Sequence, residues 1–391
     1  MSKADGVALE ALAERARSQG RIGFDTEFVS EGRYRALLCL VQLVVEGDEG
    51  PEIVVIDALD GEGPGPGPVG EVLADPAIEV VVHAGRQDIP LVKRMWGVQP
   101  RNLFDTQIAA AFVGASVQPS YEALLGQFLR RPVSKSATFT RWDRRPLTDE
   151  QLSYARADVE HLLPLAASLR ERLEQRGRLE WAREESRPLE EVSDERDPEE
   201  IFRRLPRVAD LKAQAAAVAL ELTGWREEIA AREDRHVRWI LPDPAIIEIA
   251  RRQPTKLGEL GDIRGVKGSS VRRLGPEILD VVRRGREAPP VKLDRTRAEI
   301  PPDEAGALVA LAEALLRTRA LEAELAYGLI AARAELLEVV TSVLAGQEEP
   351  SVPVLAGWRR DLVGAELLEL LAGHRTITVG ERGLLRSEPS S

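Results

Sequence analysis

Apolar runs separated by polar turns predict a layered α/β unit in the first half of the chain. Gly and Pro alternate at 61–68, which predicts a loop there. Apolar runs typical of strands occur at 21–28, 36–45, 52–58 and 78–85. Helical spacing follows at 88–96, 104–112, 120–129 and 147–175, and an amphipathic helix precedes the first strand. Strands followed by helices favour an α/β layer, and the order of the strands stays open.

Two proline-containing breaks divide the rest of the chain. Residues 184–206 are acidic and predict a linker, and 288–302 form a second break. Apolar positions recur with helical spacing at 208–287 and 303–343; short helices and a frayed tail are expected after them. We therefore expect one α/β domain and two small all-α domains, with boundaries at 1–185, 206–288 and 300–385.

Composition excludes several classes of protein. The chain has 391 residues, 43% of them hydrophobic, and no uncharged apolar run of about 18 residues that would span a membrane. Its N-terminus lacks the features of a secretory signal, and its single cysteine, Cys39, excludes an intramolecular disulfide. We expect a cytoplasmic protein that has no membrane association and no obligate protein partner.

The net charge of −12 argues weakly against a nucleic-acid partner. Its distribution argues the other way, because residues 251–286 carry ten Lys and Arg against four Asp and Glu, a local balance of +6. Acidic residues are concentrated elsewhere, for example at 190–200. The local basic patch therefore keeps nucleic-acid binding open.

Four acidic side chains in three segments indicate a metal-dependent site. Asp25 and Glu27 lie two apart in a strand and share a face, and Asp88 lies where a strand turns into a helix. Tyr154 and Asp158 lie four apart on a helix and also share a face. Clustered carboxylates repel one another unless cations neutralise them. Oxygen ligands select Mg²⁺ or Mn²⁺, and two such ions about 3.5–4 Å apart suit phosphodiester hydrolysis.

Each of these signals is weak alone, and neighbouring residues have ordinary explanations. Asp88 by itself reads as a first-turn helix acid. Asp57 and Asp105 end apolar segments, so we expect a turn residue and a helix N-cap. His83 is expected to be structural. Trp225 and Trp239 have apolar neighbours at helical spacing and are expected in a core.

Several motifs in order resemble one family. FDTEF, LCLVQL, HAGRQD, LFDTQIAAAF, SYEALLGQFL and the stretch 141–165 together resemble ribonuclease D, a group of DEDD 3′–5′ exonucleases with tyrosine in the third motif. The match runs from about 20 to 175. The other subclass has histidine five residues before the last acid, where this chain has Ser153.

The resemblance implies a ribonuclease-H-like exonuclease domain with a mixed sheet. It places the metal-binding acids on Asp25, Glu27, Asp88 and Asp158, and the water-orienting tyrosine on Tyr154. It implies hydrolysis of RNA from the 3′ end to nucleoside 5′-monophosphates, with structured RNA such as precursor tRNA as the substrate class.

The later regions resemble the helical modules of the same family. Residues 208–287 resemble an HRDC domain (helicase and ribonuclease D C-terminal), and 303–380 resemble a second one more faintly. The chain departs from the family after the first motif, where it has SEGRYRALLCL in place of an aromatic and proline pattern. The GEGPGPGP loop is a second departure, of unassigned role.

Basic side chains near these motifs are candidates for an RNA path. In the first domain they are interleaved with Phe139 and Trp142, and cations with stacking aromatics suit single-stranded ends. Core packing of Trp142 and pairing of the arginines with nearby acids are the alternatives. The candidates are Lys135, Arg141, Arg144 and Arg145 with their neighbours Arg130 and Arg131, and, in the second domain, Arg251, Arg252, Lys256, Lys267, Arg272 and Arg273.

The sequence thus predicts a two-metal 3′–5′ exoribonuclease. Two alternatives remain: an RNA-binding scaffold whose nuclease domain is catalytically weak, and an exonuclease directed at DNA. All five expected site residues are present, which disfavours the scaffold. The chain lacks the phosphate-binding motif G-x-x-x-x-G-K-[ST] of helicases, which favours a stand-alone RNA-processing enzyme.

Overall fold

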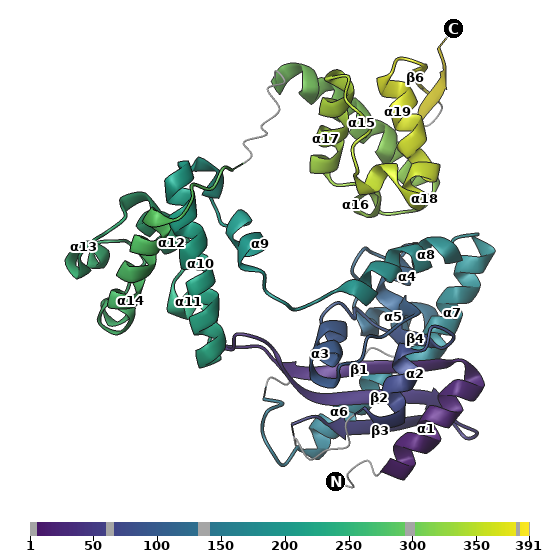
Figure 1. Cartoon of the computed structure of the whole chain (residues 1–391). Helices are drawn as coiled ribbons and strands as arrows, with labels where there is room; N and C mark the ends of the chain where they lie inside the picture. Colours follow the sequence, from purple (N-terminus) through teal and green to yellow (C-terminus); the bar gives the residue numbers. More distant parts are fainter. Residues whose placement is uncertain (1–5, 60–65, 132–140, 294–301, 381–383, 391) are drawn as a thin grey trace.

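The computed structural model describes residues 6–59, 66–131, 141–293, 302–380 and 384–390. Figure 1 shows a sheet-containing unit near the N-terminus and two helical units that follow it in the chain. In the described part of the chain, every helix is too short or too polar to cross a bilayer. The division at 1–185, 206–288 and 300–385 stays a prediction.

A mixed five-stranded sheet organises the first unit, as expected. Its order is β3-β2-β1-β4-β5, with β1 antiparallel to β2, β2 antiparallel to β3, and β4 parallel to both β1 and β5. The strands are β1 (Arg21–Val29), β2 (Leu37–Glu46), β3 (Pro51–Asp57), β4 (Glu79–Val82) and β5 (Leu103–Asp105). Four of them fall on the predicted apolar runs. The edge strand β5 was not predicted, because three residues carry no periodic signal.

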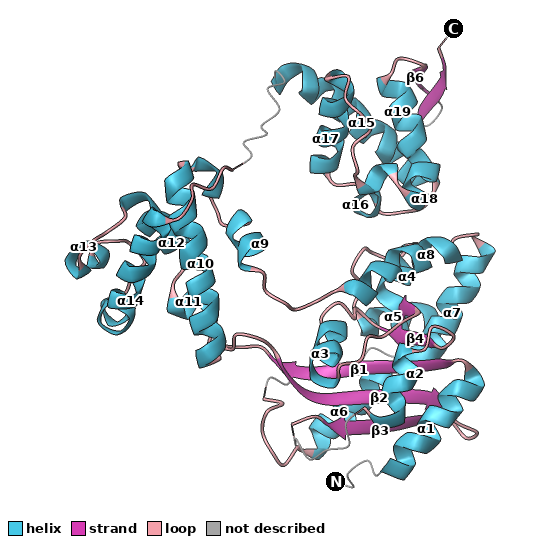
Figure 2. Ribbon diagram, viewed as in Figure 1, coloured by secondary structure: helices cyan, strands magenta, loops and turns pink. Residues whose placement is uncertain are grey.

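Helices cover both faces of this sheet (Figure 2). Alternate residues of β2 divide between them: Val41, Leu43 and Val45 pack in the core of one face, whereas Leu40 and Val44 pack toward the other. The first face is covered by α1 (Gly6–Gln19), α2 (Gly67–Ala74) and α3 (Asp88–Trp96). The second is covered by α4 (Thr106–Ala111), α5 (Tyr121–Leu129), α6 (Asp149–Glu160), α7 (Leu162–Gln175) and α8 (Leu179–Ser186).

The long helix predicted at 147–175 is in fact two helices. α6 ends at Glu160 and α7 begins at Leu162, with His161 between them at φ −111° and ψ 10°. Pro164 explains the break, because proline has no N–H to donate to the carbonyl of Glu160 four residues earlier, and its ring collides with that carbonyl. The predicted capping box is confirmed at the start of α6, where Thr148 and Gln151 satisfy each other's backbone N–H groups.

The middle region has a hydrophobic core of its own, as its helical pattern predicts. It contains α10 (Ala213–Glu233), α11 (Val237–Ile240), α12 (Asp243–Arg252), α13 (Leu257–Gly261) and α14 (Gly268–Glu287). α10 and α14 pack closely, since a Cβ on Gly285 would lie 2.6 Å from the Cα of Val218. The preceding linker is partly helical, with η1 (Arg187–Glu191), α9 (Pro198–Arg203) and η2 (Val208–Asp210).

The last region is helical apart from a terminal hairpin. Its helical elements are α15 (Pro302–Glu322), α16 (Tyr327–Ile330), α17 (Arg333–Leu344), η3 (Pro353–Leu355), α18 (Gly357–Arg359), the π-helical turn η4 (Arg360–Gly364) and α19 (Ala365–Leu371). The strands β6 (Arg375–Val379) and β7 (Leu385–Pro389) pair antiparallel. The frayed tail predicted at 386–391 is therefore wrong up to Pro389.

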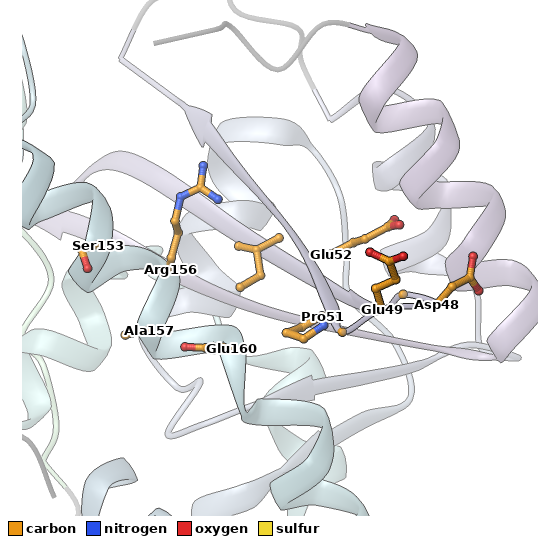
Figure 3. Close-up of a pocket in the computed structure, with 11 residues that line it drawn as sticks. Asp48, Glu49, Pro51, Glu52, Ser153, Arg156, Ala157 and Glu160 are labelled. Atoms are coloured by element: carbon orange, nitrogen blue, oxygen red, sulfur yellow. The ribbon is translucent and has the colours of Figure 1, made fainter. Parts of the chain in front are cut away.

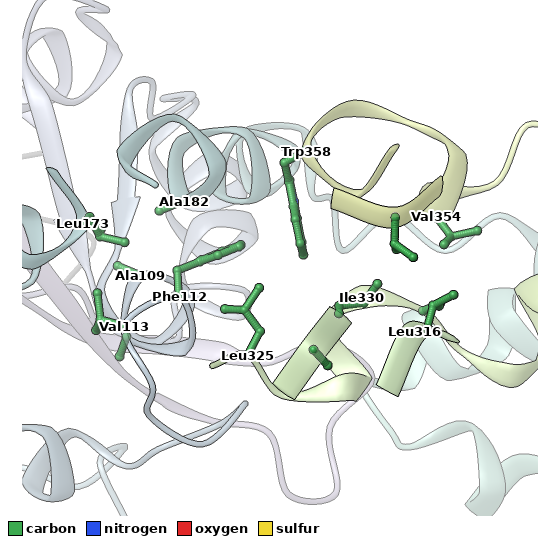
Figure 4. Close-up of a cluster of buried hydrophobic side chains, with 14 of the residues drawn as sticks. Ala109, Phe112, Val113, Leu173, Ala182, Leu316, Leu325, Ile330, Val354 and Trp358 are labelled. Atoms are coloured by element: carbon green, nitrogen blue, oxygen red, sulfur yellow. The ribbon is translucent and has the colours of Figure 1, made fainter. Parts of the chain in front are cut away.

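The last region shares a hydrophobic cluster with the sheet unit (Figure 4). The Trp358 ring meets Phe112 edge to face with centroids 5.0 Å apart, and stacks on Trp181 at 5.3 Å. Glu185 of α8 accepts hydrogen bonds from Nη1 and Nη2 of Arg359 at 2.7 and 2.9 Å. Residues far apart in the sequence thus complete one core.

The middle region contacts the β1–β2 loop. The His236 N–H donates to the Gly32 carbonyl at 2.9 Å, and Arg33 pairs with Asp234 at 2.7 Å. Gly32 has φ +74°, and a Cβ there would lie 2.8 Å from the ring of Trp239. Trp239 is 57% exposed, so its predicted core position is wrong; it covers this loop instead. Trp225 is buried as predicted.

Candidate active site

The central strand β1 presents two of the acids to the α6 side of the sheet. Asp25 lies opposite Gln42 and Glu27 opposite Leu40 in the antiparallel register with β2. Leu40 packs in the same cluster as Ala155 of α6, which fixes that face. The register between β1 and β2 shifts between Glu27 and Phe28, and a shift of this kind bends a strand locally.

The third acid begins a helix beside the end of β1. Asp88 is the first residue of α3 and is buried. Its Oδ1 accepts a hydrogen bond from the hydroxyl of Thr26, the residue between Asp25 and Glu27. This bond fixes the N-terminus of α3 against β1, so the three acids share one corner of the unit.

The fourth acid and the tyrosine come from α6. Tyr154 donates a hydrogen bond to Asp158, as their four-residue spacing allows. The ring of Tyr154 lies 6.0 Å from that of Trp142, which is itself buried. The alternative that Trp142 packs in a core is therefore confirmed, and its ring packs against the ring of Tyr154.

Burial raises the pKa of all four acids, and the charges of the other acids raise the pKa of Asp25 and Glu27 further. Burial first, and then Asp88, Asp158 and Glu27, raise the pKa of Asp25 well above its usual value. Burial and the charges of Asp158 and Asp88 raise the pKa of Glu27 to about 8. Burial raises the pKa of Asp158 to about 7 and that of Asp88 to about 6. The structure thus brings all four acids into one electrostatic cluster.

Other residues near the cluster were missed by sequence reasoning. Glu122 of α5 adds to the raised pKa of Asp158, after burial. Burial and the charges of Asp158 and Asp25 raise the pKa of the neighbouring Tyr121. Gln42 is fully buried opposite Asp25, and neither atom of its side-chain amide has a hydrogen-bond partner among the described residues. Only the strand pairing, which the sequence left open, brings Gln42 to Asp25.

The residues set aside on sequence grounds have structural roles. The Asp105 carboxylate caps α4 by accepting from the N–H groups of Gln107 and Ile108, as expected. Asp57 binds Arg145 with both carboxylate oxygens. His83 lies 3.0 Å from the Thr106 hydroxyl through Nδ1, which confirms a structural histidine.

The donor set of the cluster fits hard divalent cations. Four carboxyl groups with raised pKa values supply only oxygen ligands, and a cation would favour their ionised forms. Among the described residues, no three or more acidic, histidine or cysteine side chains are arranged so that together they could hold a metal ion. The Thr26 hydroxyl engages one oxygen of Asp88.

Two of the basic candidates of the first unit form ion pairs. Arg141 pairs with Asp143, and Arg145 with Asp57, so the pairing alternative holds for both. Arg144 is exposed. Lys135 and Phe139 lie outside the described residues. A role of this segment in RNA binding stays a prediction.

The basic candidates of the middle region are all exposed. Arg251 and Arg252 pair with Glu248, and Arg273 pairs with Glu233 at 2.7 Å. Ion pairs in the described structure do not include the other three, Lys256, Lys267 and Arg272. RNA contact at these six positions also stays a prediction.

An open pocket on another side of α6 is unsuited to RNA. It has a volume of about 860 Å³ and lies between α6 and the β2–β3 turn (Figure 3). Its lining includes Arg156 but four acids, which are Asp48, Glu49, Glu52 and Glu160. The pocket is lined by neither Tyr154 nor any of the four clustered acids, so the acid cluster with Tyr154 remains the candidate site.

Comparisons with known proteins agree with this arrangement. A family model described as 3′-5′ exonuclease matches residues 4–174, and the HRDC domain model matches 215–282. The chain is 36% identical to a ribonuclease D of Gluconacetobacter diazotrophicus over 375 residues, which cover 95% of this chain and 92% of the relative. It is 35% identical to a ribonuclease D of Acidiphilium cryptum, over 96% of this chain and 93% of the relative.

A solved structure resembles most of the chain. The crystal structure of Escherichia coli RNase D, an exoribonuclease involved in structured RNA processing, has a TM-score of 0.81 and 27% sequence identity. The match covers 94% of this chain and 97% of that one. Sequence, sheet topology and helical modules thus lead to one family: this chain belongs to the ribonuclease D family of 3′–5′ exonucleases.

Proposed function

We propose that this chain is a metal-dependent 3′–5′ exoribonuclease that releases nucleoside 5′-monophosphates from RNA. The observation that carries the proposal is the cluster of four carboxyl groups whose pKa values are raised by burial and, at Asp25 and Glu27, also by the neighbouring acids. A protein tolerates such a cluster where bound cations offset its charge. Structured RNA, such as precursor tRNA, is the proposed substrate class, and the cytoplasm is the proposed location.

In this proposal Asp25, Glu27, Asp88 and Asp158 hold two divalent cations, Mg²⁺ or Mn²⁺. Cations held there would supply the activation of the attacking water and the stabilisation of the leaving 3′ oxygen. Thr26 orients Asp88 through its hydroxyl, and β1 has an irregularity just after Glu27.

Tyr154 orients the attacking water beside Asp158. Burial and the charges of Asp158 and Glu27 raise the pKa of Tyr154 above its usual value, so the hydroxyl keeps its proton at neutral pH. A protonated hydroxyl both donates and accepts hydrogen bonds, which positions a water without competing for its proton. Packing of the tyrosine ring against Trp142 keeps the hydroxyl in place.

The proposal is tested with the Asp25→Asn variant. We expect it to lower the rate of 5′-monophosphate release from RNA in Mg²⁺ or Mn²⁺ by about 100-fold or more, because even residues that only support metal ligands cost about 10–100-fold. Its folding should be intact by circular dichroism. Asp48→Asn is the matched control, since the Asp48 side chain is 96% exposed.

Three outcomes would contradict the proposal. Undiminished hydrolysis by pure Asp25→Asn would remove the acids from the chemistry. Failure of the unmodified protein to hydrolyse RNA in either metal would favour an RNA-binding scaffold. Faster hydrolysis of single-stranded DNA than of RNA of the same sequence would favour a DNA-directed exonuclease.

A further inference from the structure

Gln42 is a fully buried polar side chain whose amide makes no hydrogen bond. It is 0% exposed, and neither Oε1 nor Nε2 has a partner among the described residues. Burying an amide without a hydrogen bond is costly, and an apolar side chain of similar shape would avoid that cost. A group of this kind in the middle of a sheet therefore requires an explanation, and a role in the chemistry of the site is one.

The backbone beside Gln42 is committed to the sheet. β2 lies between β1 and β3 and pairs with both of them. In such ladders the N–H and C=O groups of neighbouring strands bond to one another. A hydrogen-bond partner for the Gln42 amide therefore has to be a side chain on the same face of the sheet.

Apolar side chains surround most of the amide on that face. Residues two apart in a strand share a face, so Leu40 and Val44 flank Gln42 along β2. Leu40 packs with Ala155 of α6. On the next strand, Val55 of β3 lies opposite Gln42. None of these side chains can accept or donate a hydrogen bond.

The sheet is covered closely one residue pair further along. Gly23 of β1 lies opposite Val44. A Cβ on Gly23 would lie 2.7 Å from Cγ1 of Val44 and 3.1 Å from Cδ2 of Leu162, the first residue of α7. Hydrocarbon thus fills the space on this side of Gln42, and the remaining side is that of β1.

The residue of β1 that faces Gln42 is Asp25. Directly opposite residues of an antiparallel pair have Cβ atoms about 4.5–5.5 Å apart, whereas diagonal neighbours lie about 7–8 Å apart. Asp25 is directly opposite, and Glu27, which is opposite Leu40, is diagonal. A carboxylate only accepts hydrogen bonds, and the glutamine amide has two N–H donors. The register therefore offers the Asp25 carboxylate as the partner of Gln42.

We propose that Gln42 is a positioning residue, which donates from its side-chain amide to the carboxylate of Asp25 while Asp25 takes part in holding the cations. The inference rests on the proposed function, because it concerns the same acids. Carboxylates that bind metals are themselves hydrogen-bonded, and these partners fix their orientation. Thr26 does the same for Asp88 through its hydroxyl. The buried amide is thus retained at a cost in stability because the reaction uses it.

The first test measures cation binding without RNA. Mn²⁺ is titrated by calorimetry into the unmodified protein and into Gln42→Met, which has a similar shape and no donor. We expect the Kd for Mn²⁺ to rise about tenfold or more, as is usual when the partner of a metal ligand is removed. The melting temperature of the variant in EDTA should be at least that of the unmodified protein.

A matched control perturbs the same strand on its other face. Leu43 follows Gln42 in β2, is fully buried, and packs in the core on the α1–α3 side. Leu43→Met conserves volume and is expected to be tolerated. Its Kd for Mn²⁺ should stay within about twofold of that of the unmodified protein. An equal loss of affinity in both variants would refute positioning by Gln42, because any repacking of β2 would then have the same effect.

Hydrolysis kinetics separate positioning from RNA binding. For Gln42→Met, the Mn²⁺ concentration that gives half the maximal rate should rise by the same factor as the Kd. KM for RNA at saturating Mn²⁺ should stay within about twofold, because a fully buried side chain does not touch RNA. A raised KM with an unchanged dependence on Mn²⁺ would contradict the proposal.

A shorter amide distinguishes hydrogen bonding from space filling. Gln42→Asn keeps the N–H donors but leaves the space of one methylene empty, whereas Gln42→Met fills the space without a donor. We expect Gln42→Asn to bind Mn²⁺ more tightly than Gln42→Met. The reverse order would show that Gln42 acts only by filling space, which refutes the proposal.

The outcomes also separate this inference from the proposed function. If the unmodified protein neither binds Mn²⁺ nor hydrolyses RNA, the proposed function fails, and the inference fails with it. If the unmodified protein does both, Asp25→Asn loses both, and Gln42→Met behaves like the unmodified protein, the role of Gln42 alone is refuted.

Discussion

Four carboxyl groups share one corner of the sheet unit because β1 contributes two of them and α3 and α6 contribute one each. The sequence predicted them, since a two-residue strand spacing and a four-residue helix spacing are local geometry that needs no tertiary structure. Glu122 and Gln42 were not predicted as site neighbours. Their positions depend on how α5 packs and on the register of β1 and β2, and no local pattern encodes that.

The raised pKa values predict an unusual pH dependence of stability. Each of these carboxyl groups has a higher pKa in the folded protein than in the unfolded chain, where it is near 4. Such a group contributes fully to the free energy of unfolding below pH 4, and it loses this contribution as the pH rises toward its folded pKa. Glu27 at about 8, Asp158 at about 7 and Asp88 at about 6 place the loss between pH 4 and 8. In EDTA, the melting temperature should therefore fall over this range.

Calorimetry with and without metal measures this effect. Mg²⁺ or Mn²⁺ should raise the melting temperature at pH 8 far more than at pH 5, because cations bind the ionised carboxylates. Glu27→Gln should flatten the pH dependence, and Glu71→Gln on the exposed side of α2 should not. If the melting temperature changed with pH equally in the unmodified protein and in Glu27→Gln, the raised pKa of Glu27 would not be the cause of the pH dependence.

Among the secondary-structure elements, long periodic segments were predicted well and short or interrupted ones were not. Four strands and most helices follow from their periodicity, and the mixed sheet with its helical modules agrees with the family expectation. β5 has only three residues, which is too short to show a pattern. The helical spacing of apolar residues continues from α6 into α7, so it gave no sign of the break at Pro164. The β6–β7 hairpin was missed because its strands are mostly exposed and only partly apolar.

The register of β1 and β2 predicts a stabilising substitution. It buries Gln42 opposite Asp25 with no hydrogen-bond partner for its amide among the described residues. A buried polar group without a partner costs about 1–3 kcal/mol, so Gln42→Met should raise the free energy of unfolding by about that amount. Urea unfolding monitored by circular dichroism measures the change. Gln175→Met, on the exposed end of α7, should be neutral; a lower midpoint for Gln42→Met would show that the amide has a partner in solution.

Across the whole molecule, both helical regions attach to the sheet unit rather than trail behind it. The middle region contacts the β1–β2 loop, and the last region completes the core around Phe112 and Trp181. The spacing of apolar positions showed only that helical regions exist, because attachment depends on side chains that meet from distant positions. The exposed Trp239 is an example, since its apolar neighbours in the sequence predicted a core.

The ion pair between Glu185 and Arg359 predicts how the last region can be detached. Glu185→Arg places like charges together at a partly buried contact, which should weaken docking by about 2 kcal/mol or more. Small-angle scattering should then show a larger radius of gyration with unchanged helix content. The exchange Glu185→Arg/Arg359→Glu should restore the original radius. An unchanged radius in the single variant would show that the aromatic contacts hold the region alone.

The shared core around Trp358 also has a consequence for biosynthesis. Phe112 and Trp181 are translated first, and Trp358 leaves the ribosome 177 residues after Trp181. At a translation rate of about 5–20 residues per second, the rings of Phe112 and Trp181 stay exposed to solvent for roughly 10–35 s. During that interval the nascent sheet unit has an exposed apolar surface that is buried in the finished protein. Truncated or stalled nascent chains should therefore be chaperone clients, and the last residues translated complete the first core.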